Sequence, residues 1–295
     1  MCNLEPLNYV LNNDQSFYFF LRQKMISIPK QRIIRLVAFL LVLTLLGDLY
    51  LITLPDRDPK WLIIGKTIKL VFPKYYKVFQ RSQQDSRLQW FEKVAQNKRI
   101  PLHAASGWGY MSEKQYNSMI DHVLQELPIK EGDSVFELGC GVGAVLLRIR
   151  NAYGVKVSIG GSDLSPKSIV KARKIFPNEK DNFYALSMTE KNNRLQDNSY
   201  DHVISFGALA MYLYKDEMEL ALREAIRIAK PGGRLCFTHF IEPDGVLKGS
   251  ILEPMEKSHW KTIAKKHLME NLKVKQMIEQ KDRYFVCFSK KSDHV

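Results

Sequence analysis

Residues 133–143 are Asp-Ser-Val-Phe-Glu-Leu-Gly-Cys-Gly-Val-Gly, and this stretch decides how the chain around it folds. Val135 to Leu138 is a short apolar run of the kind that forms a buried strand, and three glycines follow it at once. A turn built from glycines can pass close beneath a ligand and point its backbone N–H groups at it, because no Cβ intervenes. Val145, Leu146 and Ile149 then recur at helical spacing. The stretch therefore predicts a strand, a glycine turn and a helix.

The chain continues outward from this turn in alternating strand and helix patterns. Such alternation is typical of an α/β fold, in which helices cover both faces of a mostly parallel sheet. Helices are expected from about residue 116 to Pro128, after the glycine turn, and over 166–176, 216–229 and 259–272. Seven strands are expected, over residues 135–138, 156–160, 183–188, 202–208, 234–241, 274–278 and 284–289.

The spacing of the glycines and two acidic residues limit which cofactors the turn is expected to bind. Gly139, Gly141 and Gly143 form G-x-G-x-G, whereas the dinucleotide fingerprint is G-x-G-x-x-G, so the pattern disfavours NAD and FAD. Glu137 stands two residues before the first glycine. Asp163 ends the second expected strand, where a carboxylate can accept hydrogen bonds from both hydroxyls of a ribose. A plain helix N-cap is the alternative role for this aspartate.

The segment from Glu137 to Gly143 resembles motif I of the class I S-adenosylmethionine-dependent methyltransferases. Residues 197–201 resemble the acidic turn before the family's fourth strand, and 227–235 resemble the end of the helix that precedes its fifth. The likeness covers about Ser106 to Lys290, with its parts in the family's order. It implies a Rossmann-like class I methyltransferase fold, an enzyme, and S-adenosyl-L-methionine as the cofactor.

The resemblance also implies a cofactor site, residue by residue. Glu137 would hold the methionyl ammonium and Asp163 the ribose, with Leu164 against the adenine. In the family the third strand often ends in an aspartate that binds the adenine amine, and this chain has Ser187 and Met188 there, which leaves the adenine contacts open. The implied set, in which Ser205 and Phe206 flank the sulfonium, is Glu137, Gly139, Cys140, Gly141, Gly143, Asp163, Leu164, Ser187, Met188, Ser205 and Phe206.

Methyl transfer from a sulfonium is an in-line displacement, for which the protein mainly aligns the reactants and excludes water, and no metal is required. A hydroxyl acceptor benefits from a general base, and His239 and Tyr212 are the candidates. A hydrogen-bonded core histidine is the alternative reading of His239. Trp108 and Tyr110, with Tyr116, precede the first strand, where related enzymes often place a lid over the substrate. Ordinary packing explains these rings equally well.

The acceptor is expected to be a small organic molecule or a lipid. Enzymes that methylate exocyclic amines of nucleotides usually carry Asn/Asp-Pro-Pro-Tyr/Phe after the fourth strand, whereas this chain has Ser205 to Ala208, Ser-Phe-Gly-Ala. A nucleic-acid partner is therefore not expected, although a net charge of +13 suits any anionic surface. The alternatives are an RNA or protein methyltransferase and a non-catalytic membrane scaffold that keeps the fold. The sequence gives no indication of the oligomeric state.

A long apolar segment lies near the N-terminus. Ile33 to Leu54 is 22 residues long, and at about 1.5 Å per residue it would extend roughly 33 Å, close to the thickness of a bilayer core. Prolines at 55 and 59 end it. The expected organisation is a tail over 1–32, a transmembrane or membrane-anchoring helix over 33–54, a juxtamembrane linker with an amphipathic segment over 55–100, and the methyltransferase domain over 101–295.

The sequence favours a single-pass protein with its catalytic domain in the cytosol. Four widely spaced cysteines show no disulfide framework, and no Asn-x-Ser/Thr sequon occurs. Basic residues flank the apolar segment evenly, so the positive-inside rule decides nothing. Supply of the cofactor, which is made in the cytosol, decides the expected orientation.

Overall fold

The computed structural model describes one compact unit of the chain, which runs from Gln83 to Val295. The predicted membrane segment 33–54 lies outside the described residues, as do Tyr110 and Tyr212. Within the described part, no helix is both long enough and apolar enough to cross a bilayer. The described residues are 85, 88–109, 111–154, 156–209, 215–240, 257–267, 269–277 and 280–292.

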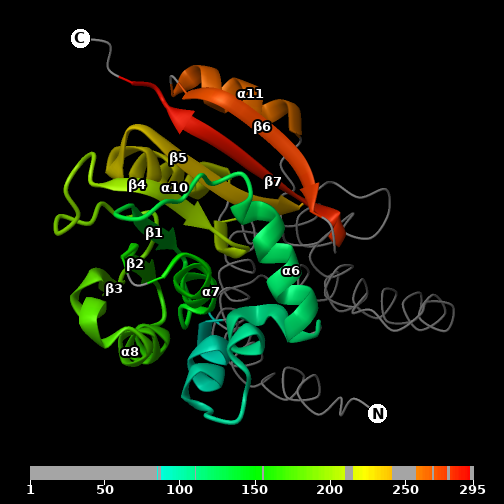
Figure 1. The fold of residues 1–295 in the computed structure, drawn as a ribbon, viewed down its shortest axis with the longest axis vertical. Helices are drawn as coiled ribbons and strands as arrows, with labels where there is room; N and C mark the ends of the chain where they lie inside the picture. Colours follow the sequence, from blue (N-terminus) through cyan, green and yellow to red (C-terminus); the bar gives the residue numbers. More distant parts are fainter. Residues whose placement is uncertain are drawn as a thin grey trace, which may run out of the picture. The chain divides into compact units, whose positions relative to one another are not determined.

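A seven-stranded sheet of order β3-β2-β1-β4-β5-β7-β6 forms the centre of this unit (Figure 1). The five strands from β3 to β5 are parallel, as predicted, and β7 pairs antiparallel with both of its neighbours, so the sheet is mixed. The strands are β1 Ser134–Leu138, β2 Ser158–Asp163, β3 Phe183–Ala185, β4 Tyr200–Ser205, β5 Ala229–Phe240, β6 Met269–Met277 and β7 Gln280–Lys290.

Helices cover both faces of the sheet, as predicted. Side chains alternate across a strand, so Val135 joins the core beneath α6, α7 and α8, and the next residue, Phe136, joins the core beneath α10 and α11. The helices are α6 Glu113–Leu124, α7 Ala144–Tyr153, α8 Pro166–Ile175, α10 Lys215–Ile228 and α11 Lys257–Lys266, with short turns η1 Ala104–Trp108 and η2 Pro177–Asn182 and a helix over 88–96.

Local sequence explains where two of these helices begin. Ser112 and Gln115 form a capping box at the start of α6, in which the Gln115 N–H donates to Oγ of Ser112 at 3.3 Å and the Ser112 N–H donates to Oε1 of Gln115 at 3.0 Å. Ser165 caps α8, and Pro166 follows at its first position. Because Ser165 is the cap, the alternative role proposed for Asp163 is excluded.

The helix predicted over 259–272 is wrong beyond Lys266. The structure ends α11 at Lys266, and the chain enters β6 at Met269. Asn271 has a φ of 53°, and the register of β6 on β7 shifts between Glu270 and Lys273, which marks an irregular strand. Pairing with β7 overrides the helical spacing of the local sequence, because the outer edge of β7 would otherwise leave its backbone groups without partners.

The structure contains a disulfide that the spacing of the four cysteines does not predict. Cys236 of β5 and Cys287 of β7 face each other across the antiparallel ladder, with their Cα atoms 4.2 Å apart, and are bonded. The two residues are 51 positions apart, so only the sheet register brings them together. Cys140 is buried and free.

Candidate active site

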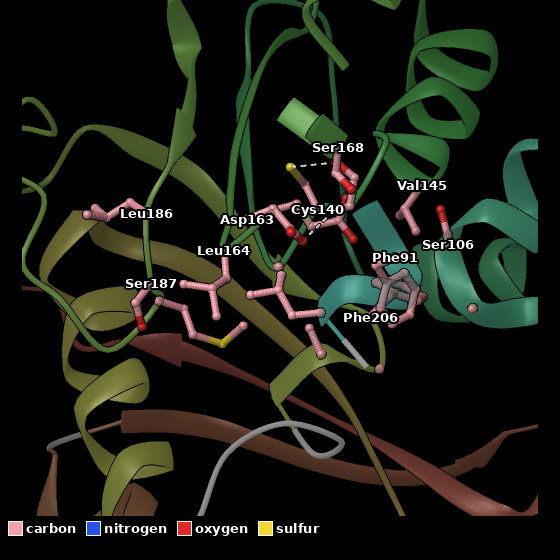
Figure 2. A pocket seen from close by; sticks show the side chains of 18 of the residues that line it. Phe91, Ser106, Cys140, Val145, Asp163, Leu164, Ser168, Leu186, Ser187 and Phe206 are labelled. Carbon is pink, nitrogen blue, oxygen red and sulfur yellow. Dashed lines mark hydrogen bonds between the residues drawn. The ribbon is translucent and has the colours of Figure 1, made fainter. Parts of the chain in front are cut away.

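A cavity of about 230 Å³ opens at the carboxyl ends of β1, β2 and β4, where parallel α/β sheets bind their ligands (Figure 2). Gly139, Cys140 and Gly141 form part of its wall, and Asp163 and Phe206 lie beside them. The site predicted from the glycine turn is therefore a physical cavity.

The three glycines of the turn have different roles. All three have positive φ, at 72°, 52° and 82° for Gly139, Gly141 and Gly143. A Cβ on Gly139 would lie 2.2 Å from that of Ala208, and one on Gly143 would lie 2.8 Å from the ring of Phe176, so both glycines permit close packing. A Cβ on Gly141 would meet only Oγ of Ser106, at 3.8 Å. Gly141 is thus the glycine that keeps the cavity open.

Asp163 ties the end of β2 to the glycine turn. Its Oδ2 accepts the N–H of Gly141 at 2.8 Å, and its Oδ1 accepts the N–H of Ser165 at 2.8 Å. Burial raises the pKa of this carboxyl, and the two backbone donors oppose the rise. Each oxygen retains a further lone pair, so the carboxylate can still accept hydrogen bonds from two ribose hydroxyls.

Glu137 is a buried carboxyl that lacks a full set of partners. Its side chain is 1% exposed, and its Oε2 has no hydrogen-bond partner within the described part of the chain. Burial raises the pKa of Glu137 well above its usual value, the charge of Asp163 raises it further, and the backbone N–H of Phe206 counteracts both. A cationic donor in the cavity would relieve both unfavourable effects. The ammonium of S-adenosylmethionine fits this requirement.

The structure brings most of the predicted site residues together but leaves two out. Gly143 and Ser205 do not line the cavity: Gly143 packs against Phe176, and the Ser205 side chain is fully buried. His239 lies on β5 opposite Tyr284 of β7, and its side chain is outside the description, as are Tyr110 and Tyr212. The predicted residues that line the cavity are Trp108, Glu137, Gly139, Cys140, Gly141, Asp163, Leu164, Ser187, Met188 and Phe206.

Other lining residues were not predicted as site residues. Leu88 and Phe91 come from the helix over 88–96, which the expected domain limits assign to the linker. Ser106 comes from η1, and Tyr116, seen from sequence only as a possible lid ring, comes from α6. No motif marks these positions, because tertiary packing alone brings them to the cavity. The remainder are Gly107, Val145, Ser168, Leu186, Thr189, Gly207, Ala208 and Glu217.

Comparison with known families agrees with this geometry. Residues 135–233, from β1 to the start of β5, match the model of a family described as a methyltransferase domain. Over these residues the chain is similar to a methyltransferase domain. The glycine turn, Glu137 and Asp163 all lie within the matched residues.

Two curated relatives are each similar to about half of this chain. The demethylmenaquinone methyltransferase of Shouchella clausii is 27% identical over 135 residues, which is 45% of this chain and 56% of the relative. A sterol 4-C-methyltransferase of Caenorhabditis elegans is 24% identical over 157 residues, 52% of this chain and 43% of the relative. The chain thus spans about half the length of the curated relatives it matches.

Solved structures share the fold of the methyltransferase domain. A possible exported protein from Bordetella parapertussis has a TM-score of 0.52 at 14% identity and covers 70% of this chain and 79% of its own. The cyclase SpnF has a TM-score of 0.52 at 15% identity and covers 78% of this chain and 96% of its own. At these identities the likeness concerns the fold alone, and the reaction has to be argued from the site.

Proposed function

We propose that this chain transfers the methyl group of S-adenosylmethionine to a small organic molecule or a lipid. The observation that carries the proposal is a pair of carboxyls, the buried Glu137 and the partly buried Asp163, on either side of an open glycine turn. The first complements a cation and the second complements vicinal hydroxyls, and both features occur in this cofactor.

The residues of the cavity would align and enclose the reactants. When bound, the cofactor supplies a methyl group that its sulfonium already activates. Glu137 holds the ammonium of the ligand and Asp163 holds its ribose hydroxyls. Phe91, Trp108 and Phe206 form an apolar wall that excludes water from the cavity. A general base at Tyr212 or His239 stays a prediction, relevant to a hydroxyl acceptor.

Binding of S-adenosylhomocysteine tests the cofactor assignment. We expect the 295-residue chain to bind it, and Asp163→Ala to weaken binding by about 1 to 3 kcal/mol because the acceptor for the ribose hydroxyls is lost. Asp163→Asn keeps one acceptor oxygen and covers the case in which the alanine variant does not fold. Isothermal titration calorimetry measures the affinities, with the exposed Asp181→Ala as the matched control.

Absence of binding by the wild-type chain would overturn the enzyme assignment in favour of a scaffold that keeps only the fold. Unchanged affinity in folded Asp163 variants would move the ribose site elsewhere in the cavity.

The acceptor we favour carries an apolar ring system. Leu88, Phe91, Trp108 and Tyr116 give the cavity a hydrophobic and aromatic wall, and two relatives bear the names demethylmenaquinone and sterol methyltransferase. A screen of quinols, sterols, phenols, amines and phospholipids for uptake of a labelled methyl group tests this preference. Transfer only to proteins or RNA would contradict it.

We further propose that residues 33–54 anchor the enzyme in a membrane, with the methyltransferase domain in the cytosol. The length and apolarity of that segment support the anchor, and supply of the cofactor supports the orientation. The Cys236–Cys287 bond points the other way, because disulfides persist in oxidising compartments.

Carbonate extraction and protease treatment of sealed microsomes separate these two parts of the membrane proposal. We expect the protein to stay with the membrane in carbonate and its domain to be digested without detergent. Release by carbonate contradicts the anchor, and a protected domain contradicts the orientation.

A further inference from the structure

Three residues that line the cavity carry polar atoms that are buried and have no hydrogen-bond partner within the described residues. These atoms are Oη of Tyr116, Oγ of Ser106 and Oε2 of Glu137. A buried polar atom without a partner is costly, so a group of them facing one cavity indicates a polar ligand.

Tyr116 is held firmly in its position. It follows the capping box on α6, its N–H donates to the carbonyl of Ser112 at 3.0 Å, and its side chain is 2% exposed. Its ring packs near those of Trp108, at 6.1 Å between centroids, and His103, at 5.8 Å. Burial, and then the charge of Glu137, raises the pKa of the phenol well above its usual value, so the hydroxyl stays protonated and can donate.

The chemistry of the three atoms is complementary. A carboxylate oxygen of Glu137 accepts hydrogen bonds, whereas the hydroxyls of Tyr116 and Ser106 can donate them. Ser106 faces the glycine turn, since its Oγ would be 3.8 Å from a Cβ on Gly141. This end of the cavity therefore offers one anionic acceptor and two neutral donors around the turn.

Figure 2 places Ser106 at a defined end of the cavity. Ser106 lies near Phe91 on one side, Leu186 and Ser187 lie on the other, and Asp163 lies between them. With the ribose at Asp163, the side of Leu186 and Ser187 receives the adenine, and the side of Ser106 receives the amino-acid portion.

We propose that Tyr116 and Ser106 donate hydrogen bonds to the α-carboxylate of the cofactor, so that this end of the cavity selects a ligand with an intact amino-acid head group. The inference rests on the proposed function and deepens it. It assigns to the hydroxyls of Tyr116 and Ser106 a positioning role in cofactor binding, in addition to the apolar wall that the Tyr116 ring supplies.

Removing the carboxylate from the ligand and the hydroxyl from the Tyr116 side chain, separately and together, tests this assignment. Affinities of the 295-residue chain are measured by calorimetry for S-adenosylhomocysteine and for its decarboxylated analogue, which keeps the amine. We expect Tyr116→Phe to weaken the binding of S-adenosylhomocysteine about tenfold or more and to change the affinity for the analogue by no more than about twofold. Ser106→Ala should show the same pattern, and Tyr153→Phe, on α7 and away from the cavity lining, is the control that should change neither affinity.

The possible outcomes distinguish this proposal from the one on which it rests. If the wild-type chain binds neither ligand, the proposed function fails and this assignment fails with it. If S-adenosylhomocysteine binds equally well to wild type and Tyr116→Phe, only this assignment is overturned. Equal weakening of both ligands, or a raised KM for the methyl acceptor with unchanged cofactor affinity, also overturns it, because the hydroxyl would then face another group.

Discussion

Gly139→Ala is expected to destabilise the domain by about 2 to 5 kcal/mol, the sum of overpacking and left-handed backbone strain. The added Cβ would lie 2.2 Å from Cβ of Ala208 and 2.9 Å from Cε of Met188. The methionine can rotate away, but Cβ of Ala208 moves only with its backbone, so the segment after β4 must shift. The φ of 72° at Gly139 adds to this cost. The midpoint of urea unfolding measures the loss.

Two other glycines separate the clash from the backbone strain. Gly132 has a φ of 88°, and a Cβ added there would have nothing within 4 Å, so Gly132→Ala reports strain alone. Gly141→Ala meets only Ser106 and should fold, while its methyl group enters the cavity and weakens S-adenosylhomocysteine binding. If Gly139→Ala and Gly132→Ala cost the same stability, the close contact with Ala208 is contradicted.

Glu137→Gln is expected to stabilise the free protein at neutral pH and to weaken S-adenosylhomocysteine binding by about 10- to 100-fold. The folded-state pKa of Glu137 lies above the ordinary carboxyl value, because burial disfavours the charged form and Asp163 repels it. The stability that Glu137 contributes to the free chain is therefore fully present below its ordinary pKa of 4.5. This contribution is lost as the pH rises through the folded-state pKa. A neutral glutamine of the same shape removes that loss.

The same carboxyl should couple cofactor binding to proton release. An ammonium beside Glu137 favours its ionised form, so binding lowers the pKa, releases protons and becomes tighter as pH rises toward the free-state pKa. Calorimetry of S-adenosylhomocysteine in buffers of different ionisation enthalpy counts the protons. The surface variant Glu131→Gln should behave as wild type, since that side chain is 66% exposed and pairs with Lys156. A binding enthalpy that does not depend on the buffer in the wild-type chain would contradict the coupling.

The sequence predicts the parallel half of the fold well, because each strand and helix there is encoded locally. The structure confirms the predicted glycine turn, and the helix caps at Ser112 and Ser165 are likewise formed by residues close together in the sequence. The antiparallel half is less predictable. The extent of β6 and the bond between Cys236 and Cys287 depend on pairings with β7, which join residues distant in the sequence.

The candidate site divides in the same way. Residues of the glycine turn and Asp163 belong to a recognisable motif, whereas Phe91 and Ser106 reach the cavity only through packing of the segment before β1. The sequence predicts Ser205 as a site residue because it ends β4. Side chains alternate along a strand, so the neighbour that lines the cavity is Phe206, and Ser205 is buried away from it.

The position of β7 has a consequence for how the domain is made during synthesis. It follows every other strand of the sheet in the sequence, yet it lies in the interior, between β5 and β6. Lys290 at its end also donates hydrogen bonds to the carbonyls of Ile226 and Ala229, at 2.9 Å each. While the chain emerges from the ribosome, β5 therefore has an unpaired edge until the last strand is released. That interval is when a strand edge of this kind is open to wrong partners.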